Sequence, residues 1–416
     1  MSTAVSSADK KTLWGNFLSL ASLKGFDYIL PLITLPYLVR VLGVEHFGIV
    51  SFAQSFAQYF ILITQYGFTL SATREISLNR DDPKKINEIF LSVMTVKLLL
   101  AAVCFLILLS TIAVFPLFRD YWMVHLFSFG LVMGDVLIPV WFFQGMERMK
   151  FIAYFNISAK LIFTCLVFLL VRGPEDVMLV PLVNGIGFVS VGLVSLYVVN
   201  RYFSIRFFVP PVAMVRHLFV DGWNIFIANI TPSLYHNSST FLLGILASNT
   251  AVGYYTAGAK LIEVGNAFMY IIARTIYPYM NRNRHAFQTM KKYLLLPGLL
   301  MTVAFLLLAD IAVKILFTDA FGDTALILRL LAVSPLTIGV MGAYGSNYLL
   351  VHKQDKLYMR IIMYSSLGGL VLLCGGIVFF QHYGAAVTVS ITRIVMAALC
   401  FAAYRRLKAA EAPEAA

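Results

Sequence analysis

The sequence is poor in charged residues and in cysteine. Charged residues make up only 12% of its 416 positions, whereas hydrophobic residues make up 60%, and the mean hydropathy is +0.83. Because soluble domains carry about 25% charged residues, this composition excludes a soluble fold and predicts membrane spans. The four cysteines lie far apart in apolar stretches with no CxxC spacing, at Cys104, Cys165, Cys374 and Cys400. Neither a disulfide framework nor a zinc site is expected.

The sequence also lacks the motifs of soluble chemistry. It contains no GxxxxGKS or GxxxxGKT phosphate loop, no HExxH helix and no aqueous segment large enough for a nucleotide-binding domain. These absences exclude an ATP-driven pump in one chain, and we expect neither an enzyme nor a bound cofactor or metal. A GIG tripeptide at 185–187 lies inside a predicted span, where small residues let helices pack closely.

Twelve stretches are apolar and long enough to cross a bilayer, which takes roughly 20 residues per helix. They predict an all-α polytopic membrane protein with about twelve transmembrane helices. The predicted spans are 13–38, 47–71, 89–115, 121–144, 151–171, 177–200, 217–246, 251–279, 293–317, 324–351, 357–381 and 383–404.

Basic residues alternate with these spans. Every second connection, together with the flanks of the first and last spans, holds 22 lysines and arginines in total, whereas the opposite connections hold only Arg40, Arg119 and Arg172. The positive-inside rule therefore predicts that both termini are cytoplasmic. The same distribution explains the net charge of +12 by membrane topology, so no nucleic-acid partner is expected.

The longest connection divides the chain near its middle. It carries Pro210 and Pro211 within the basic stretch 201–216, which we interpret as a cytoplasmic linker. The prediction is an N-terminal lobe of six spans (1–200), a C-terminal lobe of six spans (217–404) and a cytoplasmic tail (405–416). Two such lobes around a central cavity are a common plan of transporters.

Seven cations remain inside the predicted spans, and facing lipid they would cost roughly 20 kcal/mol in total. They must therefore face water, pair with acids or extend to the membrane surface. Four of them lie deep, and for these a water-filled lumen is favoured over structural ion pairs: Lys24, Lys160, Lys260 and Arg393. A cationic lumen predicts an anionic substrate.

Carboxylates within the spans are candidates for ion coupling, because a carboxylate in a site of low dielectric constant can exchange protons with the substrate or the gradient. The candidates are Asp27, Asp135, Asp221 and Glu263. The spacing of Lys24 with Asp27, and of Lys260 with Glu263, puts each pair on one helix face. A purely structural role of these pairs stays open.

Polar and helix-bending residues complete the expected cavity. Spans two and seven carry amides and a histidine that can contact sugar hydroxyls or pack helices: Gln54, Gln58, Asn229, His236 and Asn237. Span one carries residues that predict a kink, which serves either as a hinge for alternating access or as a static bend. These residues are Gly25, Pro31 and Pro36.

Three segments of the N-terminal third match a known family. They read GNFLSLASLKGFDYILPLITLPYLVRVLG at 15–43, FGIVSFAQSFAQYF at 47–60 and YGFTLSATREIS at 66–77. The sequence thereby resembles the Wzx-type O-antigen flippases, in the polysaccharide-transporter branch of the multidrug/oligosaccharidyl-lipid/polysaccharide (MOP) exporter superfamily. The C-terminal half resembles the family mainly in span number and polarity.

The resemblance implies a flippase in the bacterial inner membrane. Its substrate would be an undecaprenyl-diphosphate-linked O-antigen repeat unit, moved from the cytoplasmic to the periplasmic leaflet by alternating access, with or without proton or sodium coupling. A diphosphate fits a cationic lumen, and Arg74 in the SATRE stretch could contact it or simply anchor the helix. Expected partners are membrane lipid, an O-antigen polymerase and a chain-length regulator.

Other functions remain open at this point. One alternative is an exporter of another lipid-linked glycan, of the exopolysaccharide, teichuronic acid or enterobacterial common antigen type. A drug or cation antiporter of the same fold would favour an acidic lumen, but deep cations are at least as numerous here as acids. A membrane O-antigen polymerase or glycosyltransferase would carry a large periplasmic loop or an aqueous catalytic domain, and neither is visible.

Overall fold

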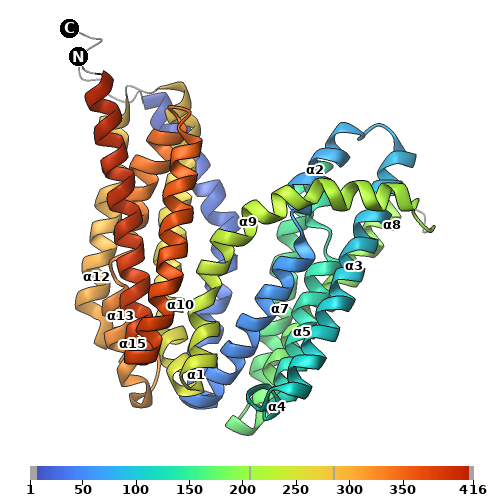
Figure 1. Cartoon of the computed structure of the whole chain (residues 1–416), viewed down its shortest axis with the longest axis horizontal. Coiled ribbons are helices and arrows are strands. Elements are labelled where there is room, and N and C mark those ends of the chain that lie inside the picture. The colour runs from blue at the N-terminus through green and yellow to red at the C-terminus, as the bar shows by residue number, and fades with distance from the viewer. Residues whose placement is uncertain (1–6, 206–207, 284–285, 412–416) are drawn as a thin grey trace. The chain divides into compact units, whose positions relative to one another are not determined.

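The computed structural model describes the backbone of residues 7–205, 208–283 and 286–411. It describes the side chains of these residues except those of 7–28, 224, 228–237 and 410–411. Helices dominate the described backbone, which contains no strand (Figure 1). Six residues predicted from the sequence as site or hinge residues lie outside the described side chains: Lys24, Gly25, Asp27, Asn229, His236 and Asn237.

The first half of the chain forms helices, most of whose bounds lie within a few residues of the predicted spans, although the first helix contains the first predicted span and most of the second. They are α1 (Ser7–Gln65), α2 (Phe68–Leu78), α3 (Pro83–Val114), α4 (Pro116–Arg119), α5 (Trp122–Leu137), α6 (Val140–Gly145), α7 (Met149–Leu170), the 3-10 turn Pro174–Met178 and α8 (Leu179–Phe203).

The second half continues in the same way. It comprises α9 (Val212–Leu246), α10 (Asn249–Arg282), α11 (Phe287–Met290), α12 (Lys292–Leu316), the 3-10 turn Asp319–Phe321, α13 (Gly322–Leu331), α14 (Ser334–Val340), the π-helix Met341–Leu350 and α15 (Asp355–Glu411).

The predicted fold class, an all-α multi-pass membrane protein, is confirmed. Among the described residues, eight helical stretches are long and apolar enough to cross a membrane. Two of them, Ile29–Leu78 with 50 residues and Asp355–Ala409 with 55, exceed by far the roughly 20 residues of one crossing. Each coincides with two predicted spans. The total of twelve crossings and the cytoplasmic placement of both ends stay predictions.

Backbone breaks divide the two longest helices. In α1 the break is at Gly43, whose φ of 73° and ψ of 177° are non-helical, and α15 breaks at Gln381. The predicted hinge residues Pro31 and Pro36 lie inside the first part of α1, which has helical dihedrals around them. The dihedral break therefore lies C-terminal to both prolines, and hinge motion at Gly25, Pro31 and Pro36 stays a proposal.

The contacts of the chain define two compact units. Unit 1 comprises residues 1–40 and 242–416, and unit 2 comprises residues 41–241. These bounds differ from the predicted lobes, 1–200 and 217–404, in the first and seventh spans, each of which groups with the other half of the sequence. The chain passes from one unit to the other within α1 and within α9.

Contacts inside each unit explain this exchange. In unit 1, the Arg40 guanidinium donates a hydrogen bond to the Ile315 carbonyl near the end of α12, where the last carbonyls of a helix have no helical donor. In unit 2, the Phe241 ring stacks on Phe56 with ring centroids 5.4 Å apart, and the Tyr59 hydroxyl is 3.0 Å from the Ser238 hydroxyl. Sequence order alone does not reveal such contacts.

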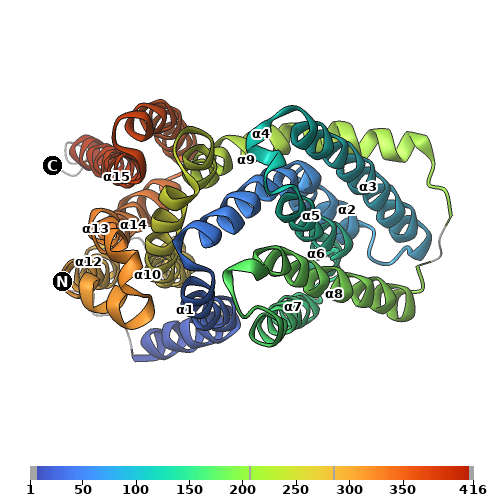
Figure 2. The ribbon, with the colours of Figure 1, turned by 90° about the horizontal axis from the view of Figure 1, so that it is seen from below.

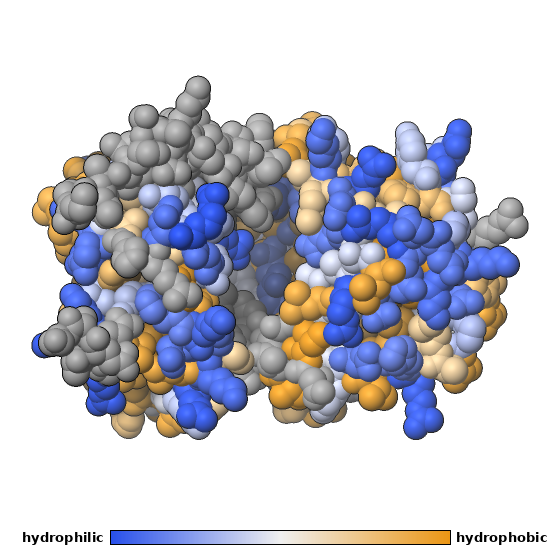
Figure 3. Space-filling view, turned by 90° about the horizontal axis from the view of Figure 1, so that it is seen from above, coloured by the Kyte–Doolittle hydropathy of each residue, from blue (hydrophilic) through white to orange (hydrophobic). Residues whose placement is uncertain are grey.

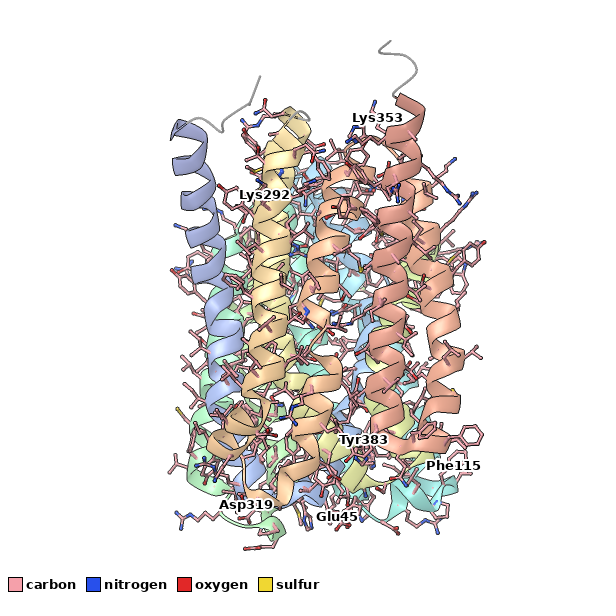
Figure 4. The ribbon with its side chains drawn as sticks, turned by 90° about the vertical axis from the view of Figure 1, so that its left-hand side faces the viewer. Glu45, Phe115, Lys292, Asp319, Lys353 and Tyr383 are labelled. Atoms are coloured by element: carbon pink, nitrogen blue, oxygen red, sulfur yellow. The ribbon has the colours of Figure 1, made fainter. Side chains whose placement is uncertain are left out.

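The helices of unit 1 run between two ends. Lys292 and Lys353 lie at one end, and Asp319 and Tyr383 lie at the other (Figure 4). By the positive-inside rule we expect the lysine end to be cytoplasmic and the opposite end, which holds the break in α15, to be periplasmic. This orientation stays a prediction.

Small residues let α5 and α8 of unit 2 pack side by side, as the view from below shows (Figure 2). A Cβ added at Gly185 would lie 3.0 Å from the Gly130 Cα atom, and one added at Gly130 would lie 2.7 Å from the Gly185 Cα atom. Both obstacles are backbone atoms. The packing role predicted for the GIG tripeptide is thus confirmed at Gly185.

We expect Gly185→Leu to destabilise the protein by about 1–3 kcal/mol, because the added side chain forces α5 and α8 apart. Thermal unfolding in detergent measures this effect. The matched control is Gly368→Leu in α15, where an added Cβ would meet nothing within 4 Å. Equal melting temperatures of the two variants would contradict the close approach.

Candidate functional site: the charged clusters of the two units

A lysine is buried in the interior of unit 2. Lys97 on α3 is only 3% exposed, and its Nζ atom lies 3.4 Å from Oδ2 of Asp135 on α5. The same ammonium donates a hydrogen bond of 3.0 Å to the Asp135 backbone carbonyl. One residue of α5 therefore supplies both a charge and a dipole to this cation.

The end of α5 explains why that carbonyl accepts a side-chain donor. In a regular helix it would accept from the N–H group four residues later, but that residue is Pro139, which has no N–H. The helix ends at Leu137, and Ile138 is extended. Lys97 thus satisfies a backbone acceptor that the proline leaves without its helical partner.

A third side chain closes the cluster. Nε2 of Gln65, at the end of α1, donates a 3.0 Å hydrogen bond to Oδ1 of Asp135. We call Gln65, Lys97 and Asp135 the Lys97 cluster. Each carboxylate oxygen of Asp135 thus has its own partner, and exchange of a proton or an ion there would compete with the Lys97 ion pair and the Gln65 hydrogen bond. The cluster joins α1, α3 and α5, which argues for a structural role of Asp135.

We expect Lys97→Met and Asp135→Asn each to lower thermal stability, since either change leaves the other group buried without its charge partner. In soluble proteins such a loss costs about 3–5 kcal/mol. The Lys97→Met, Asp135→Asn double variant should lose less than the sum of the two single variants. Strictly additive melting shifts in detergent would show that the two charges do not act as a pair.

A second, exposed cluster lies where α2 meets α9. The Arg74 side chain is 58% exposed, and its Nη2 atom is 3.8 Å from Oδ2 of Asp221. Its Nε atom is 3.7 Å from Oε1 of Glu75, and His217 Nδ1 is 3.7 Å from the other Asp221 oxygen. We call Arg74, Glu75, His217 and Asp221 the Arg74 cluster. Its separations exceed hydrogen-bond length, so the guanidinium N–H donors remain available to an anion.

The helix break before α2 positions this cluster. Tyr66 and Gly67 both have positive φ, 44° and 78°, and α9 crosses them so closely that a Cβ on Gly67 would lie 2.8 Å from the Ile225 side chain. The Tyr66 ring stacks on Phe219 and Phe226, at centroid distances of 4.6 and 5.1 Å. The beginning of α9 lies across the end of unit 2 that carries α2 (Figure 1). Hydrophilic residues cover much of this face (Figure 3).

In unit 1, the predicted pairing of Lys260 with Glu263 is present. Their charged atoms are 3.5 Å apart on α10, and both side chains are about half exposed. Arg393 on α15 is partly buried, and its Nη1 atom is buried without a hydrogen-bond partner. A second intramembrane pair, which the sequence did not predict, joins Arg329 on α13 to Asp310 on α12.

The remaining sequence candidates are scattered over unit 2. Lys160 on α7 and Gln54 on α1 are partly buried, whereas Gln58 on α1 is exposed. The structure brings Arg74 and Asp221 together but joins Asp135 to Lys97 and Gln65, which the sequence did not put forward as site residues. The bilayer cost of an unpaired lysine was the available signal for Lys97. Its partner, 38 residues away, was not deducible.

Comparison with known proteins decides the family. A model of the family described as "Polysaccharide biosynthesis protein" matches residues 13–284. The chain belongs to this family. Two proteins named "Putative O-antigen transporter" match most of its length. The one from Escherichia coli (strain K12) is 28% identical over 399 residues, which cover 94% of this chain and 96% of that protein. The one from Shigella dysenteriae is 26% identical, with coverages of 89% and 93%.

Solved structures of transporters share the fold of this family member. The lipid II flippase MurJ in an inward closed conformation has a TM-score of 0.77 at 11% identity, covering 93% of this chain and 87% of that one. An inward-facing multidrug resistance transporter of the MATE family in the MOP superfamily has a TM-score of 0.71 at 14% identity, with coverages of 94% and 97%. The resemblance predicted from the sequence is confirmed. The fold is thus one that solved membrane transporters share.

Proposed function

We propose that the protein is a flippase for undecaprenyl-diphosphate-linked oligosaccharide repeat units, which it moves from the cytoplasmic to the periplasmic leaflet of the bacterial inner membrane. The observation that carries this proposal is the match, over 94% of this chain and 96% of the relative, with a protein named as an O-antigen transporter. The transporter fold supports it.

The Arg74 cluster suits the diphosphate end of such a substrate. A guanidinium offers five N–H donors in a planar fork that matches phosphate oxygens. Among the described residues, the Arg74 guanidinium has ion-pair contacts at 3.7 and 3.8 Å and makes no hydrogen bond. Arg74 follows the predicted span 47–71, in a connection that the positive-inside rule predicts to be cytoplasmic, and this fits the leaflet where the substrate would be loaded.

Further cations and two amides are proposed as substrate contacts within the single units. Lys160 in unit 2, and Lys260 and Arg393 in unit 1, would bind charged groups of the substrate, and Gln54 and Gln58 would contact sugar hydroxyls. Lys24, Asn229, His236 and Asn237 are proposed from the sequence alone. The orphaned Nη1 atom of Arg393 supports an anion or water as its partner, because buried donors are rarely left unsatisfied.

Complementation tests the function. In a strain lacking its O-antigen flippase, expression of this protein should restore surface O-antigen and clear lipid-linked repeat units from the cytoplasmic face. Arg74→Ala should reduce the restored signal by about 10-fold or more, since a charge-assisted hydrogen bond contributes about 1.5–3 kcal/mol. The control is Arg80→Ala, which removes an arginine paired with Glu147 at 3.1 Å and should leave transport near normal.

If the protein is present in the membrane and yet restores none of several O-antigen and exopolysaccharide repeat units, the proposed flippase function is refuted. Restoration with an exopolysaccharide unit alone would instead identify the other class of lipid-linked glycan. Equal activity of Arg74→Ala and Arg80→Ala would remove Arg74 from the substrate path.

Ion coupling is proposed at Glu263, with Asp27 and Asp221 as further candidates. Glu263 is half exposed and contacts one cation at 3.5 Å, whereas Asp135 is held by two donors. Glu263→Gln should therefore make transport insensitive to dissipation of the proton or sodium gradient, and Asp135→Asn should not. Flipping in membrane vesicles, with and without an imposed gradient, measures this. An unchanged gradient response in Glu263→Gln would exclude coupling at that carboxylate.

A further inference from the structure

The turn that divides α15 carries a histidine in an unusual setting. Gln381, the residue before His382, has a φ of 48° and a ψ of −129°, a left-handed conformation that residues with a side chain rarely adopt. This turn lies between the predicted spans 357–381 and 383–404. It is at the end of unit 1 that carries Asp319 and Tyr383 (Figure 4), opposite to the lysine end.

His382 is buried without a hydrogen-bond partner. The residue is only 8% exposed, and neither of its ring nitrogens makes a hydrogen bond. Its Nε2 atom lies 3.7 Å from Oδ2 of Asp323 in the first turn of α13. That carboxylate is half exposed, so one side of the pair faces water.

Aromatic residues surround this pair from the neighbouring elements. The Tyr254 ring of α10 has its centroid 5.4 Å from that of His382, and the Tyr383 ring on α15 itself lies at 4.2 Å. Asp323 also acts electrostatically on the Tyr383 phenol. Asp323 is thus the charged group that acts on His382 in the described part of unit 1, and the two tyrosines are the other titratable groups around it.

Burial lowers the pKa of His382, and the Asp323 carboxylate raises it only in part. A histidine whose pKa is lower when buried than when exposed binds a proton preferentially in the exposed state. Acid therefore favours exposure of the imidazole, and neutral or alkaline pH favours the packed turn. The positive φ of Gln381 also favours opening of the turn, because this rarely adopted backbone conformation is required only while the turn is packed.

We propose that His382 and Asp323 form a proton-binding latch at the periplasmic end of unit 1, which holds the α15 turn packed while His382 is neutral and releases it on protonation. Asp323 sets the pH of release, because its charge stabilises the imidazolium within the packed turn and so delays release until a lower pH. The latch does not depend on the transported substrate, so it stands or falls separately from the proposed flippase function.

Cysteine labelling from outside the cell tests the latch. In a variant whose four native cysteines are replaced by alanine, Ala385→Cys introduces a thiol at a fully buried position of the turn. Phe380→Cys introduces a reference thiol at a position that is 68% exposed. The ratio of their labelling rates with a membrane-impermeant maleimide corrects for the pH dependence of thiol chemistry. This ratio should rise severalfold as external pH falls from 8 to 5, with a midpoint below the ordinary histidine value of about 6.5.

Two variants separate the latch from a merely structural turn. His382→Asn should give a ratio that no longer changes with pH. Asp323→Asn should keep the transition but move its midpoint to higher pH, because the carboxylate no longer stabilises the imidazolium in the packed turn and protonation then favours exposure more strongly. A flat ratio in the parent protein, or a pH transition that survives His382→Asn, would overturn the proposal. Absence of Phe380→Cys labelling from outside would overturn the periplasmic placement. Membrane levels of each variant are measured in the same samples.

Discussion

The hydrocarbon layer offers no hydrogen-bond partners, so polar groups within it must be satisfied by the protein itself. The Lys97 cluster shows how unit 2 meets this constraint. Pro139 removes a helical donor, Lys97 fills the resulting gap at the Asp135 carbonyl, and the Asp135 carboxylate neutralises the lysine while Gln65 occupies its other oxygen. Three helices distant in sequence are held in register by one carboxylate and the carbonyl beside it.

The same constraint separates structural charges from those available to a substrate. Lys97 is almost fully enclosed, and its ammonium donates to two oxygens of Asp135. Arg74 is exposed, and its ion pair with Asp221 is longer than a hydrogen bond. Lys260 and Glu263 are about half exposed and form a single, partly solvated ion pair. Because exposed pairs contribute little to stability, their charges can be redirected to a ligand at small cost. This contrast supports the proposed roles of Arg74 and Glu263 and argues against coupling at Asp135.

Close backbone approach is the second organising feature. Gly130 lies against Gly185 in unit 2, and Gly67 lies against the side chain of Ile225 where α9 crosses the break before α2. The family segment 66–77 therefore has a packing role in addition to the exposed guanidinium that it presents. Its glycine and tyrosine form the surface on which α9 rests, and this contact assigns most of α9 to unit 2.

The sequence by itself determined the helical membrane class, because bilayer thickness and hydropathy act over one helix at a time, and its N-terminal motifs determined the family. It also determined the pairing of Lys260 with Glu263, since a spacing of three residues puts both on one face of a helix. Only the tertiary structure decided that Asp135 pairs with Lys97, that the first and seventh spans change units, and that His382 is buried against Asp323. These outcomes depend on contacts between residues that are distant in the chain, and no local pattern of hydropathy or charge encodes them.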